Sequence, residues 1–185
     1  SRIRRVVLLG PCHRVPLRGL AVSSADAFET PFGTVPVDKE AIADVLTLPE
    51  VKVFDATHMD EHSLEVHLPF LQHILGEFTL VPLVVGTASA EEVAKVLERL
   101  WGGPETLIVI SSDLSHYLDD EAAREMDAAT CQAIEALDPG HRDEHAERHV
   151  ADRPNVVAHP ALVAKKPRPA QQKRAGRGAK PSKSD

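Results

Sequence analysis

The chain has 185 residues, of which 43% are hydrophobic, enough for one globular domain with a sizeable core. Only 4% are aromatic, so stacking on nucleic-acid bases has few side chains to use. Two cysteines, Cys12 and Cys131, are too few for a disulfide framework or a cysteine-built zinc site. No stretch reaches the roughly 20 apolar residues of a membrane helix and no signal-peptide pattern opens the chain, so we expect a cytoplasmic protein without a membrane partner.

The net charge of −7 hides two unlike parts. Residues 1–140 hold 10 of the 21 basic and 23 of the 28 acidic residues, a net charge of −13, whereas residues 141–185 carry +6. The second part is rich in Pro, Ala, Lys and Arg without apolar periodicity, so we predict a disordered tail, above all from Lys165 onward. Nonspecific binding of nucleic acid is conceivable for this tail, but a solvated tail is the simpler interpretation.

Strand and helix patterns alternate through residues 1–140. Continuous apolar runs predict buried strands, and two shorter extended pieces around the turn "DAFETPF" join them: Arg4–Gly10, Gly19–Ala25, Gly33–Asp38, Val51–Ala56, Phe78–Gly86 and Glu105–Asp113. Helical spacing and capping residues predict four helices: one capped by Asp38, His62–Leu75 interrupted at Pro69, Ser89–Gly102 with a capping box to Glu92, and Asp119–Leu137. This alternation is typical of an α/β domain with a largely parallel sheet flanked by helices.

Ionisable residues follow three of these strands directly. The first strand leads to Cys12 and His13. The two loops after Val51–Ala56 and Glu105–Ile110 bring the larger sets: His58, Asp60, Glu61 and His62, then Ser111, Ser112, Asp113, Ser115 and His116. Because the carboxyl ends of parallel strands meet at one edge of a sheet, we expect these three loops to form the ligand site together.

Cys12 and His13, at the end of the first strand, are expected to point their side chains in different directions. His13 carries an imidazole that can ligate a metal or transfer a proton, although a loop histidine bonded to backbone is an alternative. Cys12 points elsewhere from an extended backbone, so we interpret it as a small buried residue.

The stretch "DEHSLEVH" is the densest group of such residues. On a helix His62 and Glu65 share a face, but His67 is rotated about 140° from His62, so neither zinc-protease spacing is met. Asp60 and Glu61 could equally cap the helix at its positive N-terminus. His67 lies between apolar neighbours, which favours a partly buried imidazole.

The stretch "SSDLSH" allows acid–base chemistry. Asp113 can accept a hydrogen bond from His116 and orient its ring. A serine hydrolase lacks its GxSxG elbow here, and a turn bonded to its own backbone is the plainer alternative.

Four stretches in order resemble the Memo family, whose bacterial members are called AmmeMemoRadiSam system protein B. They are "LLGPCHRVPLRGLAVSSADAFETPFGTVPVD", "DEHSLEVHLPFLQHIL", "FTLVPLVVG" and "VISSDLSHY", and the similarity spans about Arg4 to Asp138. The resemblance implies a fold similar to that of class III extradiol dioxygenases. It also implies a pocket for iron or copper, and leaves the reaction open.

The resemblance assigns roles to particular residues. His13 matches the metal-binding histidine of a Gly-Pro-Ser-His motif, with Cys12 in the place of the serine. Asp113 and His116 match a pair that lines the pocket, where His116 would be the acid–base group. The remaining matches fall in the Asp-Glu-His-Ser-x-Glu-x-His segment near the same pocket: Glu61, His62 and His67, the last also a candidate catalytic residue.

Two further metal ligands of the family have no counterpart in the sequence. The first is a histidine in an Ala-Pro-His-Ala-Gly-Tyr segment, expected upstream of Ser1. The second is a cysteine in a Cys-Gly-Arg-x-Pro segment, due after residue 138, where the chain reads "GHRDEHAERHVADRPNVV". We therefore divide the chain into a partial Memo-like domain over 1–140 and a divergent tail over 141–185, with a frameshifted read-through as the hypothesis for the tail.

These observations predict a Memo-like protein whose metal site is incomplete and which is inactive by itself, because His13 alone cannot hold a catalytic metal. The alternative is a non-catalytic module that binds a protein or peptide in the same cleft. A nucleic-acid binder ranks last, since the body is acidic and almost free of aromatics. A sheet without flanking strands would expose apolar edges, so we also expect self-association.

Overall fold

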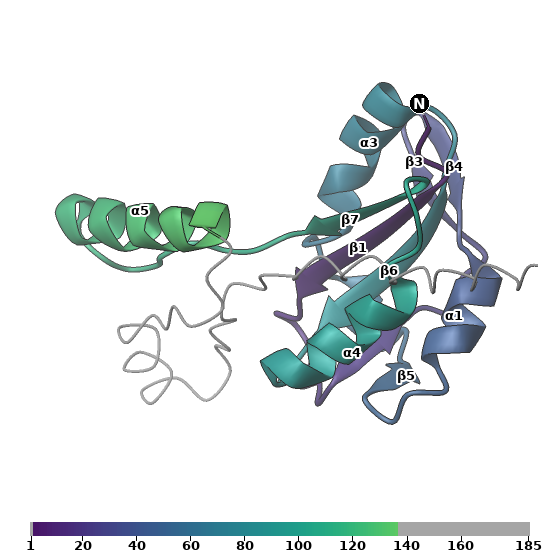
Figure 1. Cartoon of the computed structure of the whole chain (residues 1–185), viewed down its shortest axis with the longest axis horizontal. Helices are drawn as coiled ribbons and strands as arrows, with labels where there is room; N and C mark the ends of the chain where they lie inside the picture. Colours follow the sequence, from purple (N-terminus) through teal and green to yellow (C-terminus); the bar gives the residue numbers. More distant parts are fainter. Residues whose placement is uncertain (1, 137–185) are drawn as a thin grey trace, which may run out of the picture.

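The computed structural model describes residues 2–136, and the predicted tail over 141–185 lies outside them. Figure 1 shows a sheet with helices on both of its faces, followed by a long helix that stands apart. The α/β class with a mostly parallel sheet is confirmed. In the part of the chain that the structure describes, no helix is long and apolar enough to cross a membrane.

Five strands form the central sheet in the order β5-β2-β6-β1-β7. Their bounds are β1 Arg5–Pro11, β2 Leu20–Val22, β5 Val51–Val53, β6 Thr79–Val85 and β7 Thr106–Ile110. Strand β1 lies between β6 and β7 and is parallel to both. Strand β2 is antiparallel to β6 and parallel to β5, so β5 runs opposite to β1. The expectation that the carboxyl end of β5 meets those of β1 and β7 was therefore wrong.

Strand β1 is buried on both faces, as its continuous apolar run predicts. Val7 and Leu9 pack toward α1 (Lys39–Val45) and α4 (Ala90–Leu100). Val6 and Leu8 pack toward α3 (Leu68–Leu75) and the hairpin of β3 (Ala27–Thr30) and β4 (Gly33–Pro36). Each fully buried side chain of this size contributes about 1.5–3 kcal/mol of transfer free energy, so β1 is the hydrophobic centre of the fold.

The helices begin where their capping residues predict. The Asp38 carboxylate accepts the Ala41 N–H at 3.0 Å at the start of α1, and it also pairs with Arg5 at 2.8 Å. Helix α4 begins at the predicted capping box of Ser89 and Glu92. These caps supply acceptors for helix N–H groups that have no partner within the helix.

Two predicted elements differ in their details. The expected turn "DAFETPF" contains strand β3, because the Asp26–Thr30 stretch pairs back on β4 instead of only connecting two extended pieces. The helix expected over His62–Leu75 is split into a short 3-10 helix η1 (Glu65–His67) and α3. Pro69 lies in the first turn of α3, where its missing N–H costs no hydrogen bond.

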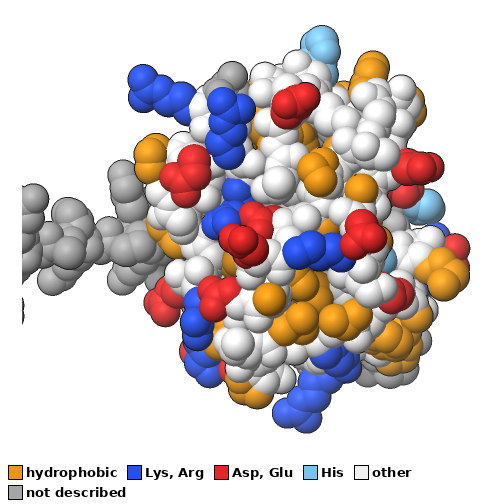
Figure 2. Space-filling view, turned by 90° about the vertical axis from the view of Figure 1, so that its right-hand side faces the viewer, with side chains coloured by type: hydrophobic (Ala, Val, Ile, Leu, Met, Phe, Trp, Pro, Cys, Tyr) orange, Lys and Arg blue, Asp and Glu red, His pale blue; other side chains and the backbone are white. Residues whose placement is uncertain are grey.

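Acidic and basic side chains are interspersed on the face that carries the β3–β4 hairpin and α1. Figure 2 shows this face without a continuous basic surface. Ion pairs account for part of the pattern, such as Lys39 with Asp26 at 2.9 Å and Arg99 with Asp44 at 3.0 Å. This mixed charge is typical of a solvated surface.

Beyond β7, the chain leaves the sheet. Helix α5 (Asp120–Ala136) follows a connecting segment and projects away from the strands (Figure 1). Among residues 2–136, β7 pairs only with β1, so its other edge is open. The four-residue α2 (Ala56–Met59), by contrast, begins the loop that returns from β5 to the end of β1.

Candidate functional site

The segment Asp60–Leu64 is pinned against the end of β1. A Cβ added to Gly10 would lie 2.8 Å from Leu64 Cδ2 and 2.8 Å from Ser63 Oγ, so the two segments touch where glycine leaves room. The Ser63 hydroxyl donates to the Pro11 carbonyl at 2.8 Å. This contact brings the loop after α2 to the carboxyl edge of β1, although β5 itself runs the opposite way.

Glu61 holds His13 by two atoms. Its carboxylate accepts the His13 backbone N–H at 2.6 Å, and Oε1 lies 3.0 Å from the His13 ring Nδ1. Oε1 also accepts the N–H groups of His62 and Ser63 at 3.0 and 3.1 Å. Only 6% of Glu61 is exposed. This buried carboxylate holds His13 in place, a larger role than the helix capping that the sequence offered as an alternative.

Asp113 engages the other side of the same imidazole. Its Oδ2 lies 2.8 Å from His13 Nε2, across 100 residues of sequence. His116 Nε2 lies 3.9 Å from the same oxygen, within ion-pair range but too far for a hydrogen bond. The prediction that Asp113 accepts a hydrogen bond from His116 was therefore wrong. Asp113 instead orients the ring of His13, and His116 lies near the same carboxylate without a hydrogen bond to it.

The two carboxylates determine the charge of His13. Burial alone would lower the pKa of His13, but the hydrogen bonds and negative charges of Glu61 and Asp113 outweigh burial and raise it above its ordinary value. Burial would raise the pKa of Glu61, but hydrogen bonds from His13 outweigh burial and lower it. An imidazole donates from both nitrogens only when protonated, so the geometry is that of an imidazolium between two carboxylates.

The described residues do not fit an iron or copper site. A tetrahedral ion bound by both His13 Nε2 and Asp113 Oδ2 would hold these atoms about 3.3–3.6 Å apart, because metal bonds to nitrogen and oxygen are about 2.0–2.2 Å long. The observed 2.8 Å is a hydrogen-bond distance. Within residues 2–136, no three His, Cys, Asp or Glu side chains are grouped so that they could hold a metal ion.

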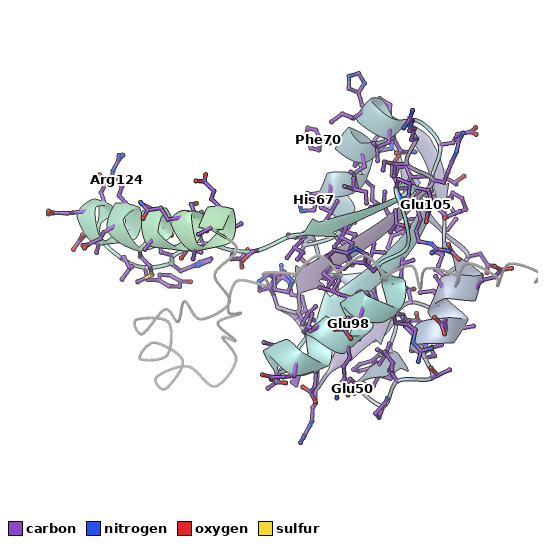
Figure 3. The ribbon with its side chains drawn as sticks, in the orientation of Figure 1. Glu50, His67, Phe70, Glu98, Glu105 and Arg124 are labelled. Atoms are coloured by element: carbon purple, nitrogen blue, oxygen red, sulfur yellow. The ribbon has the colours of Figure 1, made fainter. Side chains whose placement is uncertain are left out.

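The other sequence candidates lie outside this cluster. The Cys12 thiol donates to the Val15 carbonyl at 3.0 Å, and burial raises its pKa, but the residue is half-buried instead of fully buried as predicted. His62 pairs with Glu65 at 2.7 Å on the surface. Figure 3 shows His67 on the side of α3, next to Phe70, and among the described residues its ring forms no hydrogen bond or ion pair with His13, Glu61 or Asp113.

Sequence reasoning placed Glu61 near the pocket but missed what it does. A carboxylate that accepts a backbone N–H 48 residues away leaves no local pattern in the sequence. Gly10 and Ser63 were missed for the same reason, since their roles depend on the contact between two segments. The nearest sequence signal was that Gly10 ends a continuous apolar strand just before the polar turn.

Comparison with known proteins agrees with this description of the fold. A family model described as "Memo-like protein" matches residues 1–153, past the boundary predicted at 140. A "MEMO1 family protein" of Aquifex aeolicus is 44% identical over 138 residues, covering 72% of this chain and 51% of that protein. One from Thermotoga maritima is 39% identical over 139 residues, with coverages of 72% and 50%.

A more distant relative is "Protein MEMO1" of Danio rerio, 35% identical over 128 residues, which cover 63% of this chain and 42% of that protein. The chain spans about half the length of the curated relatives it matches. Since the family model matches well over half of the chain, the chain belongs to the Memo family.

Proposed function

We propose that this chain carries an incomplete Memo-like pocket in which His13 is held as an imidazolium, and that the chain by itself binds iron or copper only weakly and catalyses no oxidation. The observation that supports this proposal is that each ring nitrogen of His13 faces a carboxylate oxygen. Nδ1 lies 3.0 Å from Glu61 Oε1, and Nε2 lies 2.8 Å from Asp113 Oδ2. A metal ion needs a deprotonated imidazole nitrogen, so it would have to displace a ring proton and break one of these hydrogen bonds.

Metal titration of the full 185-residue chain tests this proposal. We expect metal analysis of the purified chain to find far less than one equivalent of iron or copper. Calorimetric titration with Fe²⁺ or Cu²⁺ should give weak binding that His13→Ala changes no more than a control substitution, His73→Ala, on the exposed surface of α3. Stoichiometric metal that survives purification and is lost in His13→Ala would overturn the proposal.

A second candidate function is a non-catalytic module that binds an extended peptide, and the open edge of β7 favours it. Ser111 N–H bonds to the Leu9 carbonyl, so the backbone groups of alternate residues in β7 face β1. Those of Ile108 and Ile110 therefore face the open edge, where a partner strand can pair with them, whereas the Thr106 N–H already donates to the Gly103 carbonyl at 3.1 Å. This edge leads directly to Asp113, so a peptide that paired with β7 would run toward the same pocket.

Amide hydrogen exchange tests whether the open edge of β7 binds a peptide. With a synthetic peptide of the sequence Thr106–Ile110 as the probe, a binding module should show slower exchange of the Ile108 and Ile110 amides. The amides of Leu107 and Val109 already face β1 and serve as internal controls. Unchanged exchange of the Ile108 and Ile110 amides at saturating peptide would exclude pairing at this edge.

A further inference from the structure

The segment that carries Asp113 has no regular secondary structure between β7 and α5. At its start, the Ser111 N–H donates to the Leu9 carbonyl at 2.8 Å and ties the chain to β1. At its end, the Asp119 carboxylate accepts the Ala122 N–H at 2.9 Å and so caps α5. Asp113 therefore lies between two fixed ends, on a stretch of backbone that belongs to neither the sheet nor the helix.

The two carboxylates that contact His13 are held in different ways. The Glu61 side chain is only 3% exposed and accepts several N–H groups, so its surroundings fix it. The Asp113 side chain is 50% exposed, so packing does not fix it. Holding an exposed ion pair in one geometry costs side-chain entropy, and a site on a loop is less precise than one on a helix or strand. The 2.8 Å contact between Asp113 and His13 therefore depends on what fixes the segment.

Helix α5 supplies this support. Figure 1 shows the segment running out from β7 and α5 returning alongside it. The Ser115 backbone N–H donates to Asp127 Oδ1 at 2.8 Å, which joins the segment to the middle of the helix. The Ser115 Oγ atom is closed to solvent, so the segment is closely packed at this point. Ser115 follows Asp113 by only two residues, so this bond fixes the backbone close to the carboxylate.

The turn between the segment and α5 is an unusual one. Tyr117 has a φ of 59°, in the left-handed region that a residue with a Cβ rarely adopts. Such a conformation persists only where the surrounding structure holds it. The turn redirects the chain just before α5, so the helix runs back along the segment and brings Asp127 opposite Ser115.

Helix propensity does not explain an aspartate at position 127. Aspartate is a weak residue in a helix interior, because its side chain competes for backbone groups. Asp127 lies in the third turn of α5, beyond the first turn where a carboxylate stabilises the helix dipole. It is half-buried, and its carboxylate faces the segment instead of solvent alone. The hydrogen bond to Ser115 accounts for this residue.

We propose that Asp127 is a positioning residue of the pocket, which holds the Ser115 N–H and thereby keeps Asp113 against the His13 ring. The inference rests on the proposed assignment of His13 and Asp113 to the functional pocket but not on any metal. Helix α5 then contributes to the pocket although it stands apart from the sheet, because it fixes the outer of the two carboxylates.

The Ser115 amide tests the hydrogen bond directly. In nuclear magnetic resonance of the metal-free, isotope-labelled full chain, this amide should exchange with water more slowly than in an unstructured peptide, and Asp127→Ala should remove the protection. Asp127→Asn should keep most of it, because its amide oxygen accepts the same N–H. Ser115→Ala, which removes only the hydroxyl, should also keep it. A wild-type Ser115 amide that exchanges as in an unstructured peptide would overturn the proposal, whatever the variants do.

The two ring protons of His13 test the positioning role, at a pH of about 5, where even an imidazole of ordinary pKa is protonated on both nitrogens. In Asp127→Ala the Nε2 proton, which faces Asp113, should exchange with water about tenfold faster, which corresponds to about 1.4 kcal/mol. The Nδ1 proton, which faces Glu61, should change by less than about twofold, because its partner does not depend on α5. Asp127→Asn should keep the wild-type rates. Glu125→Ala, which removes an exposed carboxylate from the same helix, should change neither rate.

Two results in a folded Asp127→Ala protein would overturn the positioning role: unchanged exchange of both ring protons, or equal acceleration of both, which is general loosening. Alanine is a better helix former than aspartate, so α5 should stay folded. If Asp127→Ala fails to fold, Asp127→Leu, of similar shape and without an acceptor, takes its place, and the wild-type Ser115 amide decides in either case. Both measurements are made without metal. Failure of the metal titration above would therefore leave these outcomes untouched, and the two proposals can fail separately.

Discussion

At the scale of single residues, the cluster depends on Glu61 more than on any histidine. This carboxylate is almost fully buried, yet its charge is balanced by the ring and backbone N–H of His13 and by two further N–H groups. A buried charge is tolerated only where such partners exist. The buried charge of Glu61 therefore needs the protonated His13 ring as a partner, just as the pocket needs Glu61 to hold that ring.

We predict that Glu61→Ala lowers the free energy of unfolding by about 2–3 kcal/mol, because hydrogen bonds to a charged acceptor are lost and their donors stay buried. Urea denaturation of the full chain followed by circular dichroism measures this. Glu98→Ala, an exposed position on α4, is the matched control and should change stability by less than about 0.5 kcal/mol. Equal effects of the two substitutions would contradict the anchoring role.

The pH dependence of stability follows from the two pKa shifts. The pKa of His13 is raised in the folded state, so its contribution is complete below the ordinary value of 6.5 and is lost as pH rises through the raised pKa. The pKa of Glu61 is lowered, so its contribution is complete above the ordinary value of 4.5 and is lost as pH falls through the lowered pKa. The pair stabilises the fold fully between these two ordinary values.

Thermal melts across the pH range check this window. The difference in Tm between the wild-type chain and Glu61→Gln should be largest between pH 4.5 and 6.5 and should shrink on both sides. Glu98→Gln should show no such maximum. A difference that keeps growing above pH 6.5 and into the alkaline range would contradict a protonated His13.

At the scale of elements, the site depends on how closely the loop after α2 approaches β1. Gly10 and the side chains of Ser63 and Leu64 occupy the same small space, and the hydroxyl of Ser63 ties that loop to Pro11. A side chain at position 10 would push the segments apart and lengthen the Glu61–His13 contacts.

We predict that Gly10→Ala destabilises the chain by about 1–3 kcal/mol, the usual cost of overpacking in a close-packed interior. In the same variant the His13 amide should lose protection against hydrogen exchange. Gly103→Ala is the control, since a Cβ there meets only the end of the flexible Glu105 side chain. A neutral Gly10→Ala substitution would show that the loop can move away without disturbing the pocket.

Sequence patterns predicted the elements far better than their relative placement. The apolar run of β1, the cap at Asp38 and the box at Ser89 are local signals, and each appears where expected. The reversed direction of β5 could not be predicted, because a three-residue strand takes its direction from its partner β2. The pairing of Asp113 with His13 instead of His116 is likewise a tertiary contact, decided by the parallel register of β1 and β7.

At the scale of the whole molecule, the sheet in residues 2–136 has two edges of unequal length. Strand β5 is a short edge of three residues, whereas β7 presents the five residues "TLIVI" at its edge. Leu107 and Val109 pack toward α3 and Ile108 toward α4, a composition typical of a strand with neighbours on both sides. Val66, Phe70 and Ile74 add an exposed apolar stripe along η1 and α3.

We predict concentration-dependent self-association of the chain through the β7 edge, to be measured by sedimentation velocity. Ile110→Lys, at a position that is 37% exposed, should reduce the association, because a charged edge residue opposes strand pairing. Val53→Lys, on the other edge of the sheet, is the matched control and should leave association unchanged. A wild-type chain that sediments as a monomer at all concentrations would contradict the prediction.

The central place of β1 has a consequence for the order in which the protein can assemble during synthesis. Of the strands in residues 2–136, β1 is translated first, and its neighbours β6 and β7 begin 74 and 101 residues later. Its apolar side chains must therefore wait, unpaired and exposed to nascent-chain contacts, until most of residues 2–136 have been translated. Pairing at such sequence separation is slow because a long loop must close first. The strand that carries His13 to the pocket is thus also the segment most in need of protection before the fold is complete.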